Sequence, residues 1–231
     1  IMFSDEQAML LDTAAEFCRK HSPIETVRAR LDADQIDATT WKEITDLGWL
    51  GINVPEEFGG LGLGLSCVVP VAESMGRYLM GTPYNGAITA SECLATSGSR
   101  EQKEEWLPKI VSGAIGSMAL IETNGSWILD QIEAQAIASE DIFELSGTKC
   151  FVTDADAADF YIVSVNVEAK ARLALVKREQ IPEGNLHREI VIDETRRSYQ
   201  LDLDGIMVPV DQLLEGSDFQ TIEFASLLLL S

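Results

Sequence analysis

The sequence predicts an α+β multidomain fold: an N-terminal all-α helical domain, a small antiparallel β-barrel or sandwich domain, and the beginning of a C-terminal helical bundle. Apolar residues recur with the period of a helix up to about residue 114, and then alternate with the period of strands. A helical apolar pattern returns near the end of the chain. Because the helical and strand-like segments form separate blocks, we expect domains at 1–114, 115–217 and 218–231 rather than an alternating α/β fold.

The first block carries helix start and stop signals. Ser4 and Gln7 have capping-box spacing at the start of the first predicted helix, and Pro23 follows its end. Thr40 and Glu43 have the same spacing and predict a second helix that starts at Thr40. Further helices are predicted at 66–79, 86–98 and 99–113. None of these helices is long enough to be stable alone, so we expect them to pack as a bundle.

The second block contains alternating or β-branched runs that are separated by turn residues. The runs lie at 143–153, 159–167, 172–178, 188–193 and 198–210. We expect a small antiparallel barrel or sandwich from them.

Composition and charge narrow the possible functions. The 231 residues include 17 Lys and Arg against 38 Asp and Glu, a net charge of −21. Such a chain repels phosphates, so we expect no binding to nucleic acid and none to an anionic membrane. The apolar run Leu227–Leu230 is too short to cross a bilayer, and we expect a soluble, cytoplasmic protein.

The residues that usually carry metal or nucleophilic chemistry are scattered. Cys18, Cys67, Cys93 and Cys150 form no ligand pattern, which favours buried thiols in a reducing compartment and predicts no metal site. The two histidines also lie in separate regions, and no nucleophile with a nearby base can be placed from spacing.

Two motifs allow an anion-binding interpretation, and we favour a structural one for both. The glycine-rich stretch 53–66 lacks the Lys-Ser/Thr of a phosphate-binding loop, so we expect a tight connection that needs positive φ angles. Arg196 and Arg197 could bind a carboxylate or phosphate, but such residues more often pair with local acidic side chains at the surface, where the pairs contribute little.

The stretch "LSGTKCFVTDA" (145–155) carries the most specific chemistry. On a strand, Phe151 and Thr153 face the same side. An aromatic ring beside a hydroxyl suits a planar heterocycle, because the ring packs on its face and the hydroxyl bonds an edge nitrogen. The alternative is a core Phe and a surface Thr. The stretch 117–127 could add backbone N–H groups and hydroxyls, although taken alone it is a turn.

Taken in order, five segments resemble the acyl-CoA dehydrogenase family. They are "FSDEQAMLLDTAAEFCRK", "LGWLGINVPEEFGGLGLGL", "SREQKEEWLPKIVSGAIGSMALIE", "LSGTKCFVTDA" and "MVPVDQLLEG". The fourth is similar to the family's "LNGxKxWITNA". The resemblance covers essentially the whole chain, and several short motifs in the right order are more specific than any one of them.

The resemblance implies an activity and its participants. It implies FAD held between the β domain and a C-terminal helical bundle, with an acyl-CoA thioester against the flavin. The reaction would remove a proton from the α carbon and a hydride from the β carbon to give the trans-2-enoyl thioester, as in fatty acid metabolism. An electron-transferring flavoprotein would accept the electrons. The oligomer would be a homodimer, a homotetramer or a hetero-oligomer with a related subunit.

The resemblance also implies roles for individual residues. Cofactor contacts fall on two segments and one serine: Leu120, Ile121 and Glu122; Phe151, Val152 and Thr153; and Ser126. Ser126 would also contact the substrate. The catalytic Glu is expected on a helix beyond Ser231.

Two departures from the family pattern support a second interpretation. Ile121 stands where the family has Thr, which removes one hydroxyl from the flavin edge. The family's "TEPxAGSD" is shortened to "IETNGSW", with Trp127 where Asp is usual. The alternative is therefore a catalytically silent subunit that acts as the structural partner in a mixed oligomer.

Overall fold

The structure, a computed structural model, describes residues 4–126 and 131–215 as a helical domain followed by a curled β-sheet domain. The α-helices are α1 Asp5–His21, α2 Ile24–Ala29, α3 Ala38–Asp46, α4 Val69–Arg77, α5 Tyr84–Ser97 and α6 Arg100–Val111. Short 3₁₀ helices are η1 Trp49–Gly51, η2 Glu56–Phe58, η3 Leu65–Cys67, η5 Arg178–Gln180 and η6 Val210–Gln212. The predicted fold class is confirmed.

The strands form two sheets. They are β1 Gly116–Ala119, β2 Ile121–Glu122, β3 Gln135–Ser139, β4 Ile142–Ser146, β5 Thr148–Thr153, β6 Phe160–Val167, β7 Lys170–Lys177, β8 Leu186–Arg188, β9 Ser198–Asp202 and β10 Met207–Pro209. One sheet runs β1-β6-β3-β4-β10, with β7 also paired to β6, and the other runs β2-β5-β9-β8. Most pairs are antiparallel, but β1 and β3 both run parallel to β6.

Two helix starts show how local signals succeed and fail. Ser4 and Gln7 form the predicted capping box, in which each side chain bonds the other residue's backbone N–H at 3.2 and 2.9 Å. The predicted start at Thr40 is wrong. Asp37 caps α3 instead, because its carboxylate accepts the N–H groups of Thr39 and Thr40.

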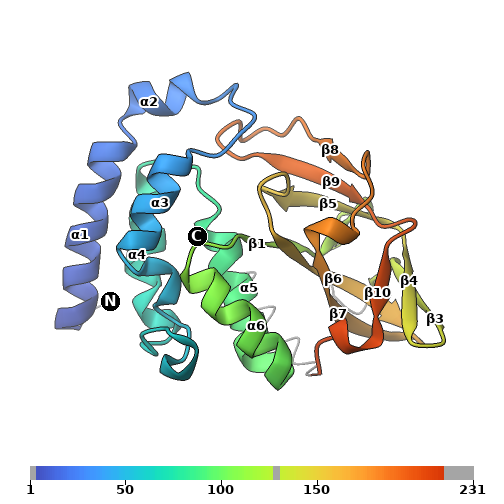
Figure 1. Ribbon diagram of the computed structural model, residues 1–231. Coiled ribbons are helices and arrows are strands. Elements are labelled where there is room, and N and C mark those ends of the chain that lie inside the picture. The colour runs from blue at the N-terminus through green and yellow to red at the C-terminus, as the bar shows by residue number, and fades with distance from the viewer. Residues whose placement is uncertain (1–3, 127–130, 216–231) are drawn as a thin grey trace.

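Helices α5 and α6 lie between the remaining helices and the sheets (Figure 1). Trp106 on α6 packs against Phe160 on β6, with ring centroids 4.4 Å apart. A Cβ at Gly116 would lie 2.6 Å from the Ala90 Cβ and from the Phe160 ring, so only glycine lets α5 approach β1 this closely. Buried side chains from both parts form continuous apolar clusters.

The glycine-rich stretch 53–66 is the tight connection that its composition predicts. Gly59, Gly62 and Gly64 have positive φ angles. A Cβ on Gly60 would lie 2.0 Å from the carbonyl oxygen of Val54, so the backbone folds back on itself there.

The sheet domain differs from expectation at several strands, since β1, β2 and β3 lie outside the predicted runs. The predicted strand at 188–193 is wrong, since β8 ends at Arg188 and the chain beyond it is irregular. Ile190 and Ile192 are fully exposed. Strands β6 and β7, by contrast, join through a two-residue turn in which Glu168 and Ala169 both have positive φ, as a tight hairpin requires.

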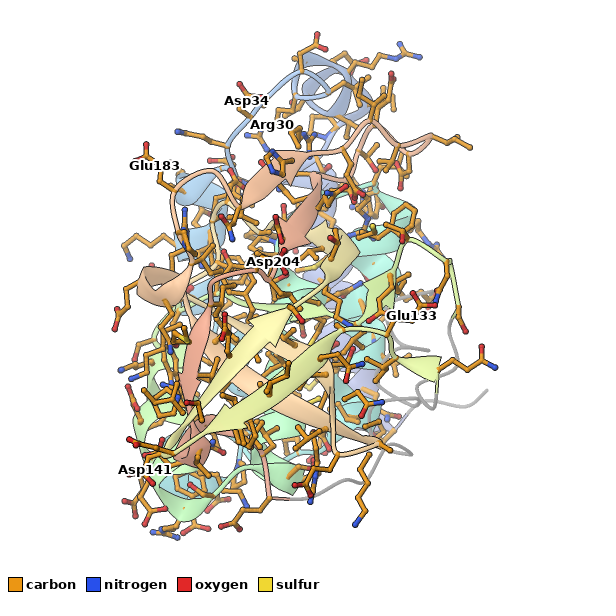
Figure 2. All side chains as sticks on the ribbon, turned by 90° about the vertical axis from the view of Figure 1, so that its right-hand side faces the viewer. Arg30, Asp34, Glu133, Asp141, Glu183 and Asp204 are labelled. Atoms are coloured by element: carbon orange, nitrogen blue, oxygen red, sulfur yellow. The ribbon has the colours of Figure 1, made fainter. Side chains whose placement is uncertain are left out.

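The acidic character of the chain is visible on its surface. Exposed Glu133, Asp141, Glu183 and Asp204 lie on the sheet side of the molecule (Figure 2). All four cysteines are buried thiols, and burial raises the pKa of Cys18 and Cys93 to about 12. Among the described residues, no helix has the length and apolarity needed to traverse a bilayer.

Some expectations concern residues outside the described ranges. These are Trp127, the 218–231 segment and the catalytic Glu expected beyond Ser231. The domain boundaries at residues 114 and 217 stay predictions.

Candidate functional site

Folding brings the two predicted cofactor segments together. Strand β2 pairs antiparallel with β5, with Ile121 opposite Cys150 and Glu122 opposite Lys149. Residues 120–122 therefore lie beside the strand that carries Phe151, Val152 and Thr153, although about thirty positions separate them in the chain.

A β-bulge presents Phe151 to solvent. The register between β5 and β9 shifts between Lys149 and Val152, and Phe151 has a φ of +56°. Bulges of this kind re-aim a side chain and are common beside functional sites. Phe151 as a whole residue is 53% exposed, so the alternative of a core Phe is excluded. A large aromatic side chain in this backbone region is strained, and such strain gathers at functional sites.

Val152 and Thr153, the two residues after Phe151, differ in burial. Val152 is fully buried, whereas Thr153 is half-buried. Among the described residues, the Thr153 hydroxyl has no hydrogen-bond partner, while its carbonyl accepts the Ser117 hydroxyl at 2.8 Å. An exposed Phe151 and a Thr153 hydroxyl without a partner among the described residues therefore lie two residues apart in the chain, and their role as a platform for a planar heterocycle stays a prediction.

Two anchors hold the bulged segment in place. The Phe151 N–H donates to Glu189 Oε2 at 2.9 Å, and the Ser198 hydroxyl donates to the same oxygen at 2.7 Å. At the far end of the segment, Asp154 is buried, has a φ of +54° and forms an ion pair with Arg197 at 2.6 Å. The strained backbone of β5 is therefore fixed by side chains from the loop 189–197.

The local surface pairing expected for Arg197 is wrong. Its side chain is buried, binds Asp154 in the turn after β5 and donates to the Gly81 carbonyl of the helical domain at 3.1 Å. Arg196 does form a local, exposed pair with Asp193, at 3.9 Å. Burial raises the pKa of Asp154 more than the nearby Arg197 lowers it.

Glu122 turns its carboxylate inward. Its Oε1 lies 2.7 Å from Lys149 Nζ, and both side chains are buried. Burial alone would raise the pKa of Glu122, but hydrogen bonds from Lys149 and from the N–H groups of Glu133 and Ala134 outweigh it and lower this pKa. A cofactor beside this strand would meet the main chain of Glu122 and not its carboxylate.

The remaining predicted residues lie at the edge of the same region. Leu120 and Ile121 are half-exposed, and the Leu120 carbonyl accepts the Ser164 hydroxyl at 3.1 Å. Ser126 follows the turn after β2, where its N–H donates to Asn124 and its hydroxyl contacts Gln131. The described residues near Ser126 are polar and exposed, which suits a contact with a polar ligand group.

Sequence reasoning missed Lys149, Asp154 and Glu189. Strict strand alternation would place Lys149 on the same face as Phe151 and Thr153, and it is the bulge between Lys149 and Val152 that lets Lys149 be buried while Phe151 is exposed. A lysine there requires a buried partner, but its position in the chain does not say which one.

The site fits a flavin in the chemistry of its groups. It offers an exposed aromatic residue, a hydroxyl without a partner among the described residues and a neighbouring segment in which Leu120 and Ile121 are half-exposed. The fold is a helical domain followed by a curled sheet, and comparisons with known proteins identify its family.

Residues 4–114 match the family described as acyl-CoA dehydrogenase, N-terminal domain. The chain is 29% identical over 180 residues to mitochondrial isovaleryl-CoA dehydrogenase of Bos taurus, covering 73% of this chain and 41% of that protein. It is 31% identical over 175 residues to acryloyl-CoA reductase (NADH) of Anaerotignum propionicum, covering 73% and 44%. A solved variant of the Tcur3481–Tcur3483 steroid ACAD superposes with a TM-score of 0.86 at 27% identity, covering 97% of this chain and 61% of that one.

The chain belongs to the acyl-CoA dehydrogenase family, of which it contains the N-terminal and middle parts. It spans 41% and 44% of the length of the two curated relatives described above.

Proposed function

We propose that this chain forms the N-terminal and middle parts of an FAD-dependent acyl-CoA dehydrogenase, which oxidises an acyl-CoA thioester to the trans-2-enoyl-CoA. The observation that carries the proposal is the bulged strand β5, which exposes the Phe151 ring beside a Thr153 hydroxyl available for bonding. Membership of the family supports the proposed activity.

The roles of the residues follow from their placement. Bound FAD would supply the acceptor for the hydride equivalent that leaves the substrate. The Phe151 ring would pack against the flavin plane, and the Thr153 hydroxyl would donate to the flavin edge. Val152, buried behind them, fixes the strand, while the main chain of 120–122 and Ser126 would line the neighbouring edge. An electron-transferring flavoprotein is the proposed electron acceptor.

An absorbance scan of the full-length protein tests this proposal. We expect a yellow protein with flavin bands that bleach when an acyl-CoA is added anaerobically. The panel of acyl-CoAs should include isovaleryl-CoA, which is named in one relative. A colourless, flavin-free preparation that is again colourless after incubation with FAD and removal of the unbound cofactor would contradict the proposal.

A second candidate function rests on Ile121, which offers no hydroxyl at a position where the family has one. In that case the chain would be a catalytically silent subunit that stabilises a mixed oligomer with a flavin-bearing relative. Native mass spectrometry of the protein purified from its own cells distinguishes the two functions. A flavin-free chain in complex with a related, flavin-loaded subunit would favour the second.

Replacing Ile121 with Thr is expected to tighten FAD binding. Residue 121 is half-exposed beside β5, so a new hydroxyl there can bond the flavin edge. One added hydrogen bond contributes about 1 kcal/mol, which is about fivefold in the dissociation constant. Fluorescence titration with FAD measures the change. The control is Ile121→Val, which has the shape of Thr without its hydroxyl, and equal affinities for the two variants would contradict the prediction.

A further inference from the structure

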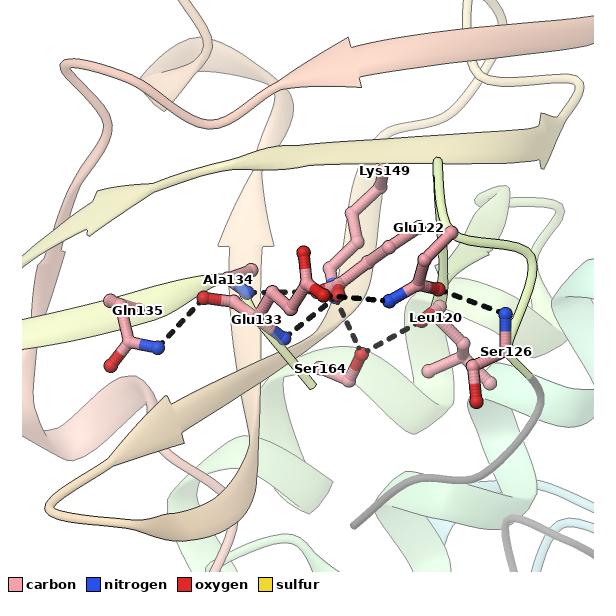
Figure 3. Close-up of polar contacts among 9 residues, drawn as sticks. Leu120, Glu122, Ser126, Glu133, Ala134, Gln135, Lys149 and Ser164 are labelled. Atoms are coloured by element: carbon pink, nitrogen blue, oxygen red, sulfur yellow. Dashed lines mark hydrogen bonds and ion pairs between the residues drawn. The ribbon is translucent and has the colours of Figure 1, made fainter. Parts of the chain in front are cut away.

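A buried ion pair lies directly behind the candidate flavin site. Lys149 Nζ donates to Glu122 Oε1 at 2.7 Å and to the Ser164 hydroxyl at 2.9 Å, and the Ser164 hydroxyl donates to the Leu120 carbonyl at 3.1 Å (Figure 3). The Lys149 side chain is 0% exposed. Within the described part of the chain, the groups that bind its ammonium belong to, or contact, the segment 120–122.

The Glu122 carboxylate joins this network to a fourth segment. Oε1 also accepts the Ala134 N–H at 2.9 Å, and Oε2 accepts the Glu133 N–H at 2.8 Å (Figure 3). These two residues lead into β3. One carboxylate thus fixes both ends of the connection between β2 and β3, and Lys149 ties that carboxylate to β5, two residues before Phe151.

We propose that Glu122 and Lys149 are positioning residues for the flavin site: their pair holds the main chain of 120–122 at a fixed distance from the bulge that carries Phe151. The inference rests on the proposed function and deepens it. Neither side chain is accessible to a ligand, so both act through the strands that they join.

A positioning role and a purely stabilising role predict different effects of variants on stability and on FAD affinity. Removing one member of a buried ion pair leaves the other charge buried without a partner and destabilises the fold. Replacing both members with neutral side chains of similar shape is often tolerated. The double variant Glu122→Gln with Lys149→Met removes both charges. The Gln amide retains one acceptor oxygen for two N–H donors. The hydrogen bonds from the N–H groups of Glu133 and Ala134 are therefore weakened, while the volume of the core stays filled.

The test compares FAD affinity with stability in the full-length protein. For the double variant we expect a denaturation midpoint close to that of the wild type, faster amide hydrogen exchange at Glu133 and Ala134, and FAD binding about ten- to a hundredfold weaker. That range is the loss seen when groups that orient metal ligands are removed. The control is Lys42→Met, which breaks an exposed pair with Asp46 in the helical domain and should leave all three measurements unchanged.

A second variant covers the case in which the double variant does not fold. Ser164→Ala deletes the hydroxyl that links Lys149 to the Leu120 carbonyl and leaves the ion pair intact. We expect it to fold and to bind FAD about two- to fivefold more weakly.

The outcomes separate the two proposals. If the wild-type protein binds FAD and a folded double variant binds it equally well, the positioning role is overturned and the proposed function stands. The same conclusion follows if the double variant does not fold and Ser164→Ala binds FAD like the wild type. If the wild-type protein binds no FAD, the proposed function is overturned, and the positioning role with it.

Discussion

Replacing Arg197 with Met is expected to lower the free energy of unfolding by about 3–5 kcal/mol, the usual cost of breaking a buried ion pair from one side. Arg197 lies 2.6 Å from Asp154, and both side chains are buried. It also donates to the Gly81 carbonyl, so the change removes a contact between the helical domain and the sheet. The carboxyl that loses its partner belongs to Asp154, which directly follows Thr153, and we therefore expect weaker FAD binding as well.

The adjacent arginine provides a matched control for this experiment. Arg196 pairs with Asp193 at 3.9 Å in an exposed position, so Arg196→Met should cost less than about 1 kcal/mol. Urea denaturation of both variants measures the difference. Equal losses of stability would show that the burial of the Arg197 pair has no energetic consequence.

The cost of Arg197→Met should depend on pH with a definite sign. Burial already holds the pKa of Asp154 above its ordinary value of 3.8, and Arg197 is the main group that lowers it. Without Arg197, this folded-state pKa rises further above the unfolded one. A raised carboxyl pKa favours the folded state at low pH, and that benefit is lost as the pH increases through the folded pKa. The variant should therefore be least stable relative to wild type at neutral pH, and the gap should narrow on acidification.

The overall fold was readable from the sequence because its signals are local. Capping at Ser4, the change of period near residue 115 and the glycine-rich connection all depend on neighbours in the chain. The prediction failed at 188–193, where "REIVID" has strand-like composition. β8 ends at Arg188, and Ile190 and Ile192 point to solvent. The composition of a segment indicates that it could form a strand, but it does not show whether a partner strand lies beside it.

The candidate site was only partly readable. Phe151 and Thr153 were singled out because strand alternation and a family resemblance both point to them. The ion pairs Glu122–Lys149 and Asp154–Arg197 join residues far apart in the chain, and no local period encodes such a contact. The positive φ of Phe151 could not be predicted from the sequence either, since it accompanies the bulge against β9.

Replacing Phe151 with Gly is expected to separate stability from cofactor binding. The φ of +56° costs a side chain with a Cβ about 1–2 kcal/mol, and glycine escapes that cost. Glycine loses about 0.5–1 kcal/mol through its greater freedom when unfolded, and the half-exposed ring gives up part of its apolar burial. These terms nearly cancel, so the free energy of unfolding should change by less than about 1 kcal/mol.

Cofactor binding should respond to Phe151→Gly far more strongly. The variant removes the aromatic face proposed to pack on the flavin, a contact worth about 1 kcal/mol beyond its area, together with the apolar area of the ring itself. We expect FAD to bind about a hundredfold more weakly in fluorescence titrations, which corresponds to a loss of about 2.7 kcal/mol. Phe151→Trp keeps an aromatic face at the same backbone position and should preserve binding. If the Gly variant retains wild-type affinity, Phe151 does not contact the flavin, and its strained backbone must then be explained by packing alone.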